Sequence, residues 1–378
     1  IRDRDMPAII TDRFRIHNSE QFQEAFSEGS GNTMYLGIGR PQAFATSTRG
    51  DARTNNEGTD TAPLTPADNL NAQHFPFDYM LAAKKIAASD VTFAIPRRNW
   101  TTGTTYDIYR HDYGDRITGT TTAQTSNSGV STLFDASYFV LTTARNVYKC
   151  LDNNGGANST VEPTGTSPTN ILSTGDGYKW KFMYTLSAAQ QANFLSTDFM
   201  AVSPNSGAGS DQSNVISAAV NGAIDIVKIK TPGSGGTNGT FTGIQIRGDG
   251  SGGVATVVVG GGQVTSVTVT TPGTGYTFAT ISNAQIVAAG ATSLSGAELD
   301  VIIEPKGGHG FNAVEELGGF YVMMNTSLEG TESGNSGDLT VANDFRKITL
   351  IRDPKAGGSA ATSTTLRATK AINLTGVS

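Results

Sequence analysis

The sequence predicts a mainly β fold. We expect a β-sandwich-like core with long loops and one or two short helices, plus an inserted domain of two tandem β-repeats. Three observations predict it. Glycine contributes 45 of 378 residues, above the usual share of ~7%, and only 16% of residues are charged. Several short segments alternate apolar and polar residues, and one Gly/Thr-rich segment occurs twice.

The duplicated segment spans Asn221–Val259 and Gly261–Glu304. At an offset of about 40 residues the two copies share apolar and turn positions, namely Val227 with Val267, Ile229 with Val269, Pro232 with Pro272, Gly235 with Gly275, and Ile246 with Ile286. Each copy should begin with a strand and continue into a type II turn at Pro-Gly. One copy buries too few aliphatic side chains to offset its ordering entropy, so we expect the two to pack together or against a neighbour.

The first part of the chain mixes short strands and helices. We predict a strand over Ile9–Ile16, a short helix capped by Asn18, a buried strand over Thr33–Gly39, a helix over Phe77–Ser89 and a strand over Val91–Ile95. A long polar loop is expected from Phe44 to about Asn71.

The next segments read as strands around a low-complexity loop. Tyr138–Val140 and Asn146–Leu151 should pair, Asp152–Ser173 should be a loop, and Tyr178–Leu186 alternates as a half-buried strand does. Strands at Phe320–Met324 and Arg346–Ile351 should rejoin the first part. Since Ser203–Ser213 and Glu304–Gly310 have linker composition, we expect a core over 1–204, an inserted repeat domain over 205–304 and a return segment over 305–378.

Charge and cysteine content exclude several classes of protein. The net charge is −6 with no long Lys/Arg run, so nucleic-acid binding is not expected. No apolar stretch approaches 18 residues, so no membrane span is predicted. A lone Cys150 allows no intramolecular disulfide. This composition fits assembly in a reducing cytoplasm.

No motif predicts catalysis, a cofactor or a metal. The four histidines are far apart in sequence and form no metal-binding pair; they are His17, His74, His111 and His309. His309 is expected to cap a turn. Gly248–Gly253 could cradle a phosphate or hold Ca²⁺, but a hairpin turn is favoured, because no helix follows and the second copy lacks the carboxylate.

One cluster of residues has the composition of a protein interface. Arg97 and Arg98 lie beside Trp100, and tyrosines follow at Tyr106, Tyr109 and Tyr113. Arg, Trp and Tyr are enriched at interface hot spots. For the arginines the alternative is a turn in which they bond local carboxylates or backbone carbonyls. For the tyrosines the alternatives are core packing and a sugar-stacking platform.

Four segments in order resemble a known family. They are Ala94–Trp100, Val147–Asp152, Gly175–Trp180 and Phe345–Ile351. With the Ile9–Arg15 opening they are similar to the β-rich, dimeric baseplate wedge subunit of T-even-type contractile-tailed bacteriophages. The resemblance covers Ile1 to about Pro204 and Glu304 to about Pro354. The repeats lie outside it, and the family's last strand has no counterpart after Ser359.

The resemblance implies a structural component of the baseplate wedge. We expect it to link other wedge proteins, to form a homodimer within the wedge, to lack catalysis, and to reside in the virion after assembly in the host cytoplasm. An alternative is a receptor- or glycan-binding tail protein. A polysaccharide depolymerase needs paired carboxylates, and no feature of the sequence selects such a pair.

Overall fold

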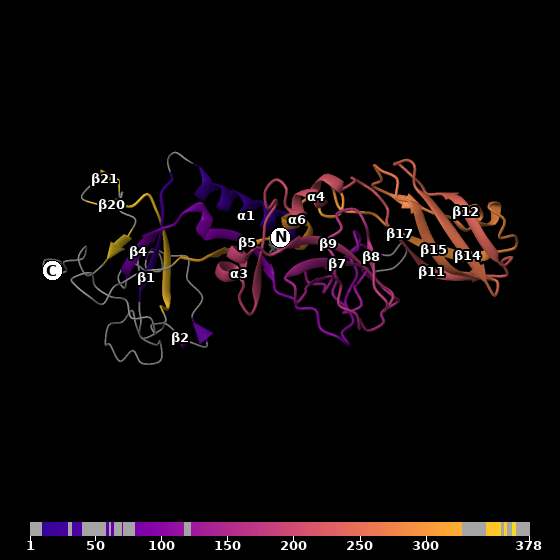
Figure 1. Ribbon diagram of the computed structural model, residues 1–378, viewed down its shortest axis with the longest axis horizontal. Coiled ribbons are helices and arrows are strands. Elements are labelled where there is room, and N and C mark those ends of the chain that lie inside the picture. The colour runs from indigo at the N-terminus through magenta and orange to yellow at the C-terminus, as the bar shows by residue number, and fades with distance from the viewer. Residues whose placement is uncertain are drawn as a thin grey trace, which may run out of the picture. The chain divides into compact units, whose positions relative to one another are not determined.

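A computed structural model of the chain describes residues 10–28, 32–39, 58–59, 62–63, 70, 80–116, 122–326, 345–356, 359–360 and 365–367 (Figure 1). The chain divides into two compact units. Unit 1 comprises residues 1–16 and 93–321, and unit 2 comprises residues 17–92 and 322–378. The described residues form several small sheets and few short helices, so the mainly β prediction is confirmed. No helix in these ranges is long and apolar enough to span a membrane.

Unit 2 contains a four-stranded antiparallel sheet in the order β19-β1-β4-β22. Its strands are β1 (Met34–Gly39), β4 (Met80–Lys85), β19 (Lys347–Arg352) and β22 (Thr365–Arg367). Tyr35 and Ala83 are buried, with Met80 and Ile351 packed against them. The strands predicted over Thr33–Gly39 and Arg346–Ile351 are therefore confirmed, apart from one or two residues at their ends.

Two secondary-structure predictions in the first part of the chain need correction. The predicted helix over Phe77–Ser89 is wrong where the structure describes it, because β4 occupies Met80–Lys85 and pairs with β1 and β22 on its two edges. Pairing of small, buried Ala82 and Ala83 outweighs their helix propensity. The predicted strand over Ile9–Ile16 is wrong from Asp12 onward, because α1 runs from Asp12 to Ser27.

The helix α1 begins earlier than predicted because Thr11 caps it. The Thr11 hydroxyl accepts a hydrogen bond from the Phe14 N–H at 3.2 Å, and the Thr11 carbonyl accepts from Arg15 N–H at 3.0 Å. Asn18 therefore lies inside the helix. Most of the loop predicted over 44–71 lies outside the described residues, which include there only β2 (Gly58–Thr59), β3 (Ala62–Pro63) and Leu70.

The core of unit 1 is an antiparallel sheet in the order β6-β7-β9-β8. Its strands are β6 (Phe139–Leu141), β7 (Asn146–Asn153), β8 (Leu172–Ser173) and β9 (Tyr178–Thr185). The predicted pairing of the first two is confirmed. The prediction that β9 is buried on one face only is wrong. Lys181 and Met183 on one face are buried, as are the aromatic side chains on the other. Helix α4 (Asp211–Ala218) packs on β9 (Figure 1).

The remaining elements of both units are short. They are η2 (Ala88–Asp90), β5 (Val91–Pro96), which pairs with β10 (Phe199–Val202), α3 (Ala188–Phe194), α6 (Ala313–Leu317), β18 (Tyr321–Met324), β20 (Lys355–Ala356) and β21 (Ser359–Ala360). The strands predicted over Val91–Ile95 and Phe320–Met324 are confirmed, the second from Tyr321 onward.

The two repeat copies exchange strands. The first copy contributes β11 (Ile226–Ser234), β12 (Gly239–Gln245), β13 (Arg247–Gly248) and β14 (Val254–Gly260); the second contributes β15 (Gln263–Thr271), β16 (Ala279–Thr280), α5 (Asn283–Ala288) and β17 (Ser295–Ile302). The first strand of each copy pairs with the last strand of the other, β11 with β17 and β15 with β14 (Figure 1). Apolar side chains from both copies form one shared core, so neither copy has a complete hydrophobic core of its own.

The two copies have the same backbone conformation at one pair of equivalent glycines, but only the second copy contains a helix, α5. Gly233 and Gly273 both have φ 69°, in the left-handed region that favours glycine. The chain does not turn at Pro232-Gly233 as predicted, because β11 continues to Ser234 and pairs with β17. Ile286 lies on α5, whereas its counterpart Ile246 lies in extended chain, and both are buried.

The predicted linkers flanking the repeats are ordered parts of unit 1. Within Ser203–Ser213 the side chain of Gln212 is buried and donates to the Ser203 carbonyl at 2.7 Å, and Ser210 caps α4. Within Glu304–Gly310 the imidazole of His309 is buried. The division into 1–204, 205–304 and 305–378 stays a prediction.

The turn glycines of the repeats supply a matched test of packing. Gly273 and Gly261 both have positive φ, but a Cβ at Gly273 lies 2.5 Å from the Gly253 backbone nitrogen, whereas one at Gly261 has no atom within 4 Å. Gly261→Ala should cost about 1 kcal/mol through backbone strain. Gly273→Ala should cost about 2–4 kcal/mol, because the clash with backbone adds to that strain. Urea unfolding measures both; equal costs for the two variants contradict the packing assigned to this turn.

Candidate protein–protein interface

The turn after β5 carries the first candidate interface residue, Arg97. Its backbone N–H donates to the Asp198 carbonyl at 2.7 Å, and its guanidinium donates to the Ser196 carbonyl at 2.8 Å and to Asn99 Oδ1 at 2.9 Å. Arg97 is half-buried and therefore retains an outward surface. It fixes the end of β5 to the chain that precedes β10.

Arg98 turns inward instead. Its guanidinium donates to the carbonyls of Phe134, at 3.0 Å, and Ala136, and it lies 4.6 Å from the centre of the Phe139 ring. Burial lowers the pKa of this guanidinium, although nearby acidic groups raise it. These contacts of Arg98 match the alternative to an interface that the sequence left open, namely a turn in which the arginines bond backbone carbonyls.

Trp100 is anchored through a chain of polar groups. Its indole N–H donates to Ser159 Oγ at 3.0 Å, and Ser159 in turn donates to the Asp176 carboxylate at 3.1 Å. Asp176 also accepts from the backbone N–H groups of Thr160 and Val161, at 2.8 and 3.0 Å. The low-complexity loop predicted over 152–173 is thereby held against the turn that carries Trp100.

The three candidate tyrosines pack mainly inside the unit. Tyr106 and Tyr109 expose only 4% and 3% of their surface. The Tyr106 ring meets the Trp180 ring edge-on, with centroids 5.7 Å apart. The half-buried Tyr113 donates its hydroxyl to the Ile108 carbonyl at 2.7 Å. Contact of the six residues with a partner stays a prediction, and their contacts within the chain hold the loops around the central sheet.

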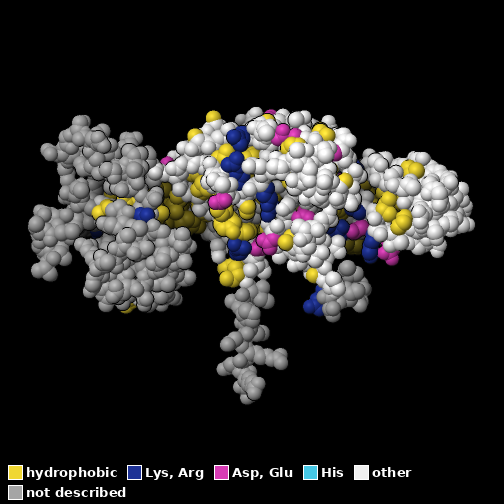
Figure 2. Space-filling model, turned by 90° about the horizontal axis from the view of Figure 1, so that it is seen from below, with side chains coloured by type: hydrophobic (Ala, Val, Ile, Leu, Met, Phe, Trp, Pro, Cys, Tyr) yellow, Lys and Arg dark blue, Asp and Glu magenta, His cyan; other side chains and the backbone are white. Residues whose placement is uncertain are grey.

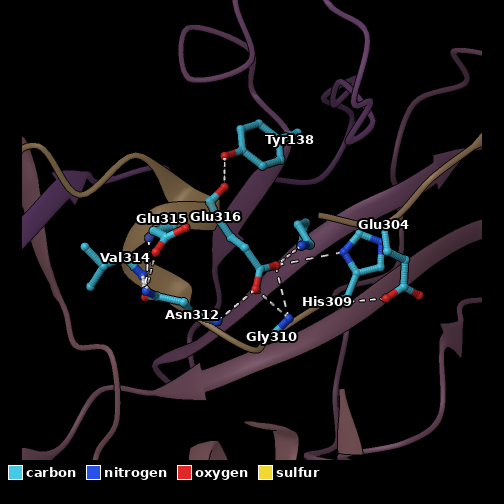
Figure 3. Close-up of polar contacts among 9 residues, drawn as sticks. Tyr138, Glu304, His309, Gly310, Asn312, Val314, Glu315 and Glu316 are labelled. Carbon is cyan, nitrogen blue, oxygen red and sulfur yellow. Dashed lines mark hydrogen bonds and ion pairs between the residues drawn. The ribbon is translucent and has the colours of Figure 1, made fainter. Parts of the chain in front are cut away.

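A buried ion pair joins β7 to α6, and Figure 3 shows the surroundings of its carboxylate, Glu316. The ammonium of Lys149, on β7, contacts the carboxylate of Glu316, on α6, and both side chains are almost fully buried. Glu316 also accepts from the Gly310 N–H at 2.8 Å and the Asn312 N–H at 3.2 Å. Burial alone raises the pKa of Glu316, but Lys149 and then His309 outweigh it and lower that pKa. Glu316 is therefore ionised and fixes the position of α6.

A second group of titratable residues was missed by the sequence analysis. Ligand atoms of Asp225, Glu304 and His309 all lie within 4.8 Å of one another. The only sequence signal is the proximity of Glu304 to His309. Asp225 joins them because it immediately precedes β11, and β11 pairs with β17, which ends just before Glu304. The sequence predicted only that His309 caps a turn, whereas the structure also places its imidazole beside two carboxyl groups.

In the part of the chain that the structure describes, small sheets and few short helices define a mainly β protein. Comparison with known families extends this. The family model described as Bacteriophage T4, Gp8, a baseplate wedge protein, matches residues 8–155. The match confirms, over that range, the resemblance to the baseplate wedge subunit of T4-type phages, and it supports a structural role in the virion baseplate. A search of curated proteins found no match.

Asp176 supplies a test of the loop that carries Trp100. Burial raises its pKa, but hydrogen bonds from Thr174 and from backbone N–H groups outweigh it and lower the pKa to about 2, below the ordinary 3.8. A carboxylate with a depressed pKa stabilises the fold at pH above its unfolded value, and this contribution is lost as pH falls from 3.8 towards 2.

Asp176→Asn should therefore lower the free energy of unfolding at pH 7 by about 1–2 kcal/mol, since an amide accepts fewer of these hydrogen bonds. The deficit relative to the parent protein should shrink as pH approaches 2, which urea unfolding at several pH values measures. Asp211→Asn, in the first turn of α4, is the control. A deficit that stays constant with pH contradicts the role given to the carboxylate.

Proposed function

We propose that this protein is a component of a contractile-tail baseplate wedge that links neighbouring wedge proteins through protein–protein interfaces, without catalysis. The observation that carries the proposal is the family match over residues 8–155, which contains the turn from Arg97 to Trp100. The protein acts as a homodimer within the wedge and is assembled in the host cytoplasm.

Exposed apolar side chains support a role in assembly. Large hydrophobic residues with high exposure occur just before and on α1, in the repeats and after them; they include Ile10 at 63%, Phe14 at 53%, Phe278 at 61% and Phe311 at 50%. Such side chains become buried when partners bind. In Figure 2, hydrophobic side chains lie next to Lys and Arg side chains on one face, a mixture suited to interfaces of moderate polarity.

The alternative function, glycan or receptor binding, receives less support. Sugar stacking needs exposed aromatic faces, and Tyr106 and Tyr109 expose too little surface to provide them. The exposed Phe278 is a single aromatic ring on the repeats. A glycan array and adsorption blocking by the purified protein test this alternative.

Reconstitution tests the wedge proposal. Purified wedge proteins of the same phage are mixed with and without this chain, and the products are separated by sedimentation. Wedges should form only when the chain is present, because it links its neighbours. Complete wedges without it exclude the linking role, and a monomer throughout in sedimentation equilibrium excludes the dimer.

Trp100→Ala tests the candidate interface. A Trp at an interface hot spot costs more than about 1 kcal/mol when truncated, so affinity for a wedge partner should fall at least about fivefold. Arg247→Ala, which truncates an exposed side chain on β13 of the repeats, is the control and should bind as the parent does. Urea unfolding shows that both variants remain folded at the assay temperature. Unchanged affinity of the folded Trp100→Ala variant removes Trp100 from the interface.

A further inference from the structure

The repeats leave and rejoin the rest of unit 1 at one place. Ile226 at the start of β11 pairs with Ile302 at the end of β17, and the Glu304 N–H donates to the Ala223 carbonyl at 3.2 Å. This pairing sets Asp225 beside Glu304. The chain then folds back so that the His309 N–H donates to the Glu304 carboxylate at 2.8 Å. Three residues from two distant stretches of sequence therefore converge.

His309 has a buried nitrogen that the described residues leave without a hydrogen bond. The residue exposes 4% of its surface, and its Nδ1 has no hydrogen-bond partner in the described part of the chain. The nearest acidic oxygen, Glu316 Oε2, is 3.9 Å away, which is too far for a hydrogen bond. Figure 3 shows the imidazole between the carboxylates of Glu304 and Glu316. Buried polar atoms of this kind are rare, and a missing ion or water is a common reason.

The acidic groups of this cluster are two adjacent carboxyl groups, those of Asp225 and Glu304. Glu316 is neutralised by Lys149. Lys181 interacts with Asp225 and Glu304 electrostatically, but its ammonium donates to the Pro168 carbonyl at 2.8 Å. The carboxyl groups of Asp225 and Glu304 are close enough that burial, and then Asp225 itself, raise the pKa of Glu304. Two adjacent carboxyl groups can share a proton or bind a cation.

We propose that Asp225, Glu304 and His309 form a divalent-cation site of the zinc type. Two carboxylate oxygens and one imidazole nitrogen are ligands that Zn²⁺ accepts, with a fourth position open to water. Mg²⁺ and Ca²⁺ favour oxygen ligands alone, so the imidazole selects against them. Tetrahedral ligand atoms lie roughly 3.3 Å apart at Zn–ligand distances near 2 Å. Atoms already within 4.8 Å of one another reach this arrangement by small side-chain rotations.

Surrounding groups suit metal binding. His309 is almost fully buried, and burial favours the neutral imidazole, which is the form that binds a metal ion. A bound ion would join the start of β11 to the chain after β17, which fixes the repeats to the rest of unit 1. This inference does not depend on the wedge assignment.

The test uses the full-length protein, stripped with EDTA and dialysed. Zn²⁺ is titrated by calorimetry, bound metal is counted by mass spectrometry, and Co²⁺ is used as a spectroscopic probe of the ligand set. The parent protein should bind one Zn²⁺ per chain, and its Tm should rise by at least about 3 °C at saturating Zn²⁺. Glu304→Gln and Asp225→Asn should each weaken binding by roughly a hundredfold or more and abolish the rise in Tm.

Glu298→Gln is the control, because Glu298 is an exposed carboxylate on β17, 3.2 Å from Lys230. It should bind Zn²⁺ as the parent does. Circular dichroism establishes that each variant is folded, and two independent ligand variants keep the test valid if one fails to fold. If the parent protein does not bind Zn²⁺, the proposal is overturned. The two carboxyl groups of Asp225 and Glu304 then share a proton and bind no cation. Unchanged binding in both ligand variants overturns it as well.

Discussion

The pairing of β11 with β17 is the constraint on which the repeats depend. The repeat segment begins and ends at neighbouring points, because this antiparallel pair brings its two ends together at Ile226 and Ile302. Two ion pairs then fix the strands to the rest of unit 1. Lys228 on β11 contacts Asp152 at 2.6 Å, and Asp300 on β17 contacts Arg110 at 2.6 Å. Both pairs are partly buried, so solvent screens them less than it screens surface pairs.

The buried ion pair between Lys149 and Glu316 fixes the position of α6, which follows the repeats in the chain. Transferring Lys149 and Glu316 out of water costs several kcal/mol for each ion, and their mutual attraction offsets this only with further hydrogen bonds. Glu316 receives them from Gly310 and Asn312. The Tyr138 hydroxyl donates to the Glu316 backbone carbonyl at 2.5 Å. An alternative packing of α6 leaves a charge buried without a partner, so the ion pair favours one arrangement of the chain after the repeats.

Local patterns predicted the strands well and the tertiary arrangement poorly. Alternation and β-branched residues identified β1, β5, β7 and β9, because these signals are contained within each strand. The helix expected over Phe77–Ser89 was wrong at β4, since pairing on two edges decides the conformation of its alanines and lies outside any local window. The strand expected over Ile9–Ile16 was wrong because the cap at Thr11 was not recognised.

Local sequence patterns were also insufficient to place the candidate interface residues in the fold. Composition selected Arg98, Tyr106 and Tyr109 as interface residues, but composition cannot separate an interface from a core, because both are rich in aromatic side chains. The three-residue group at the junction was invisible for a different reason. Asp225 and Glu304 become neighbours only through the pairing of β11 with β17, and the sequence predicted the repeats without predicting which strands pair.

The exchange of strands between the copies explains how a duplicated unit of marginal stability can serve as part of a scaffold. Because β11 pairs with β17 and β15 with β14, loss of either copy leaves the other with an unpaired strand and an open core. The apolar cluster contains Ile224 and Val301 from the ends of the segment as well as Val257 and Ile286 from its interior. The two copies must therefore fold together, and opening the junction requires breaking the strand pair and both ion pairs.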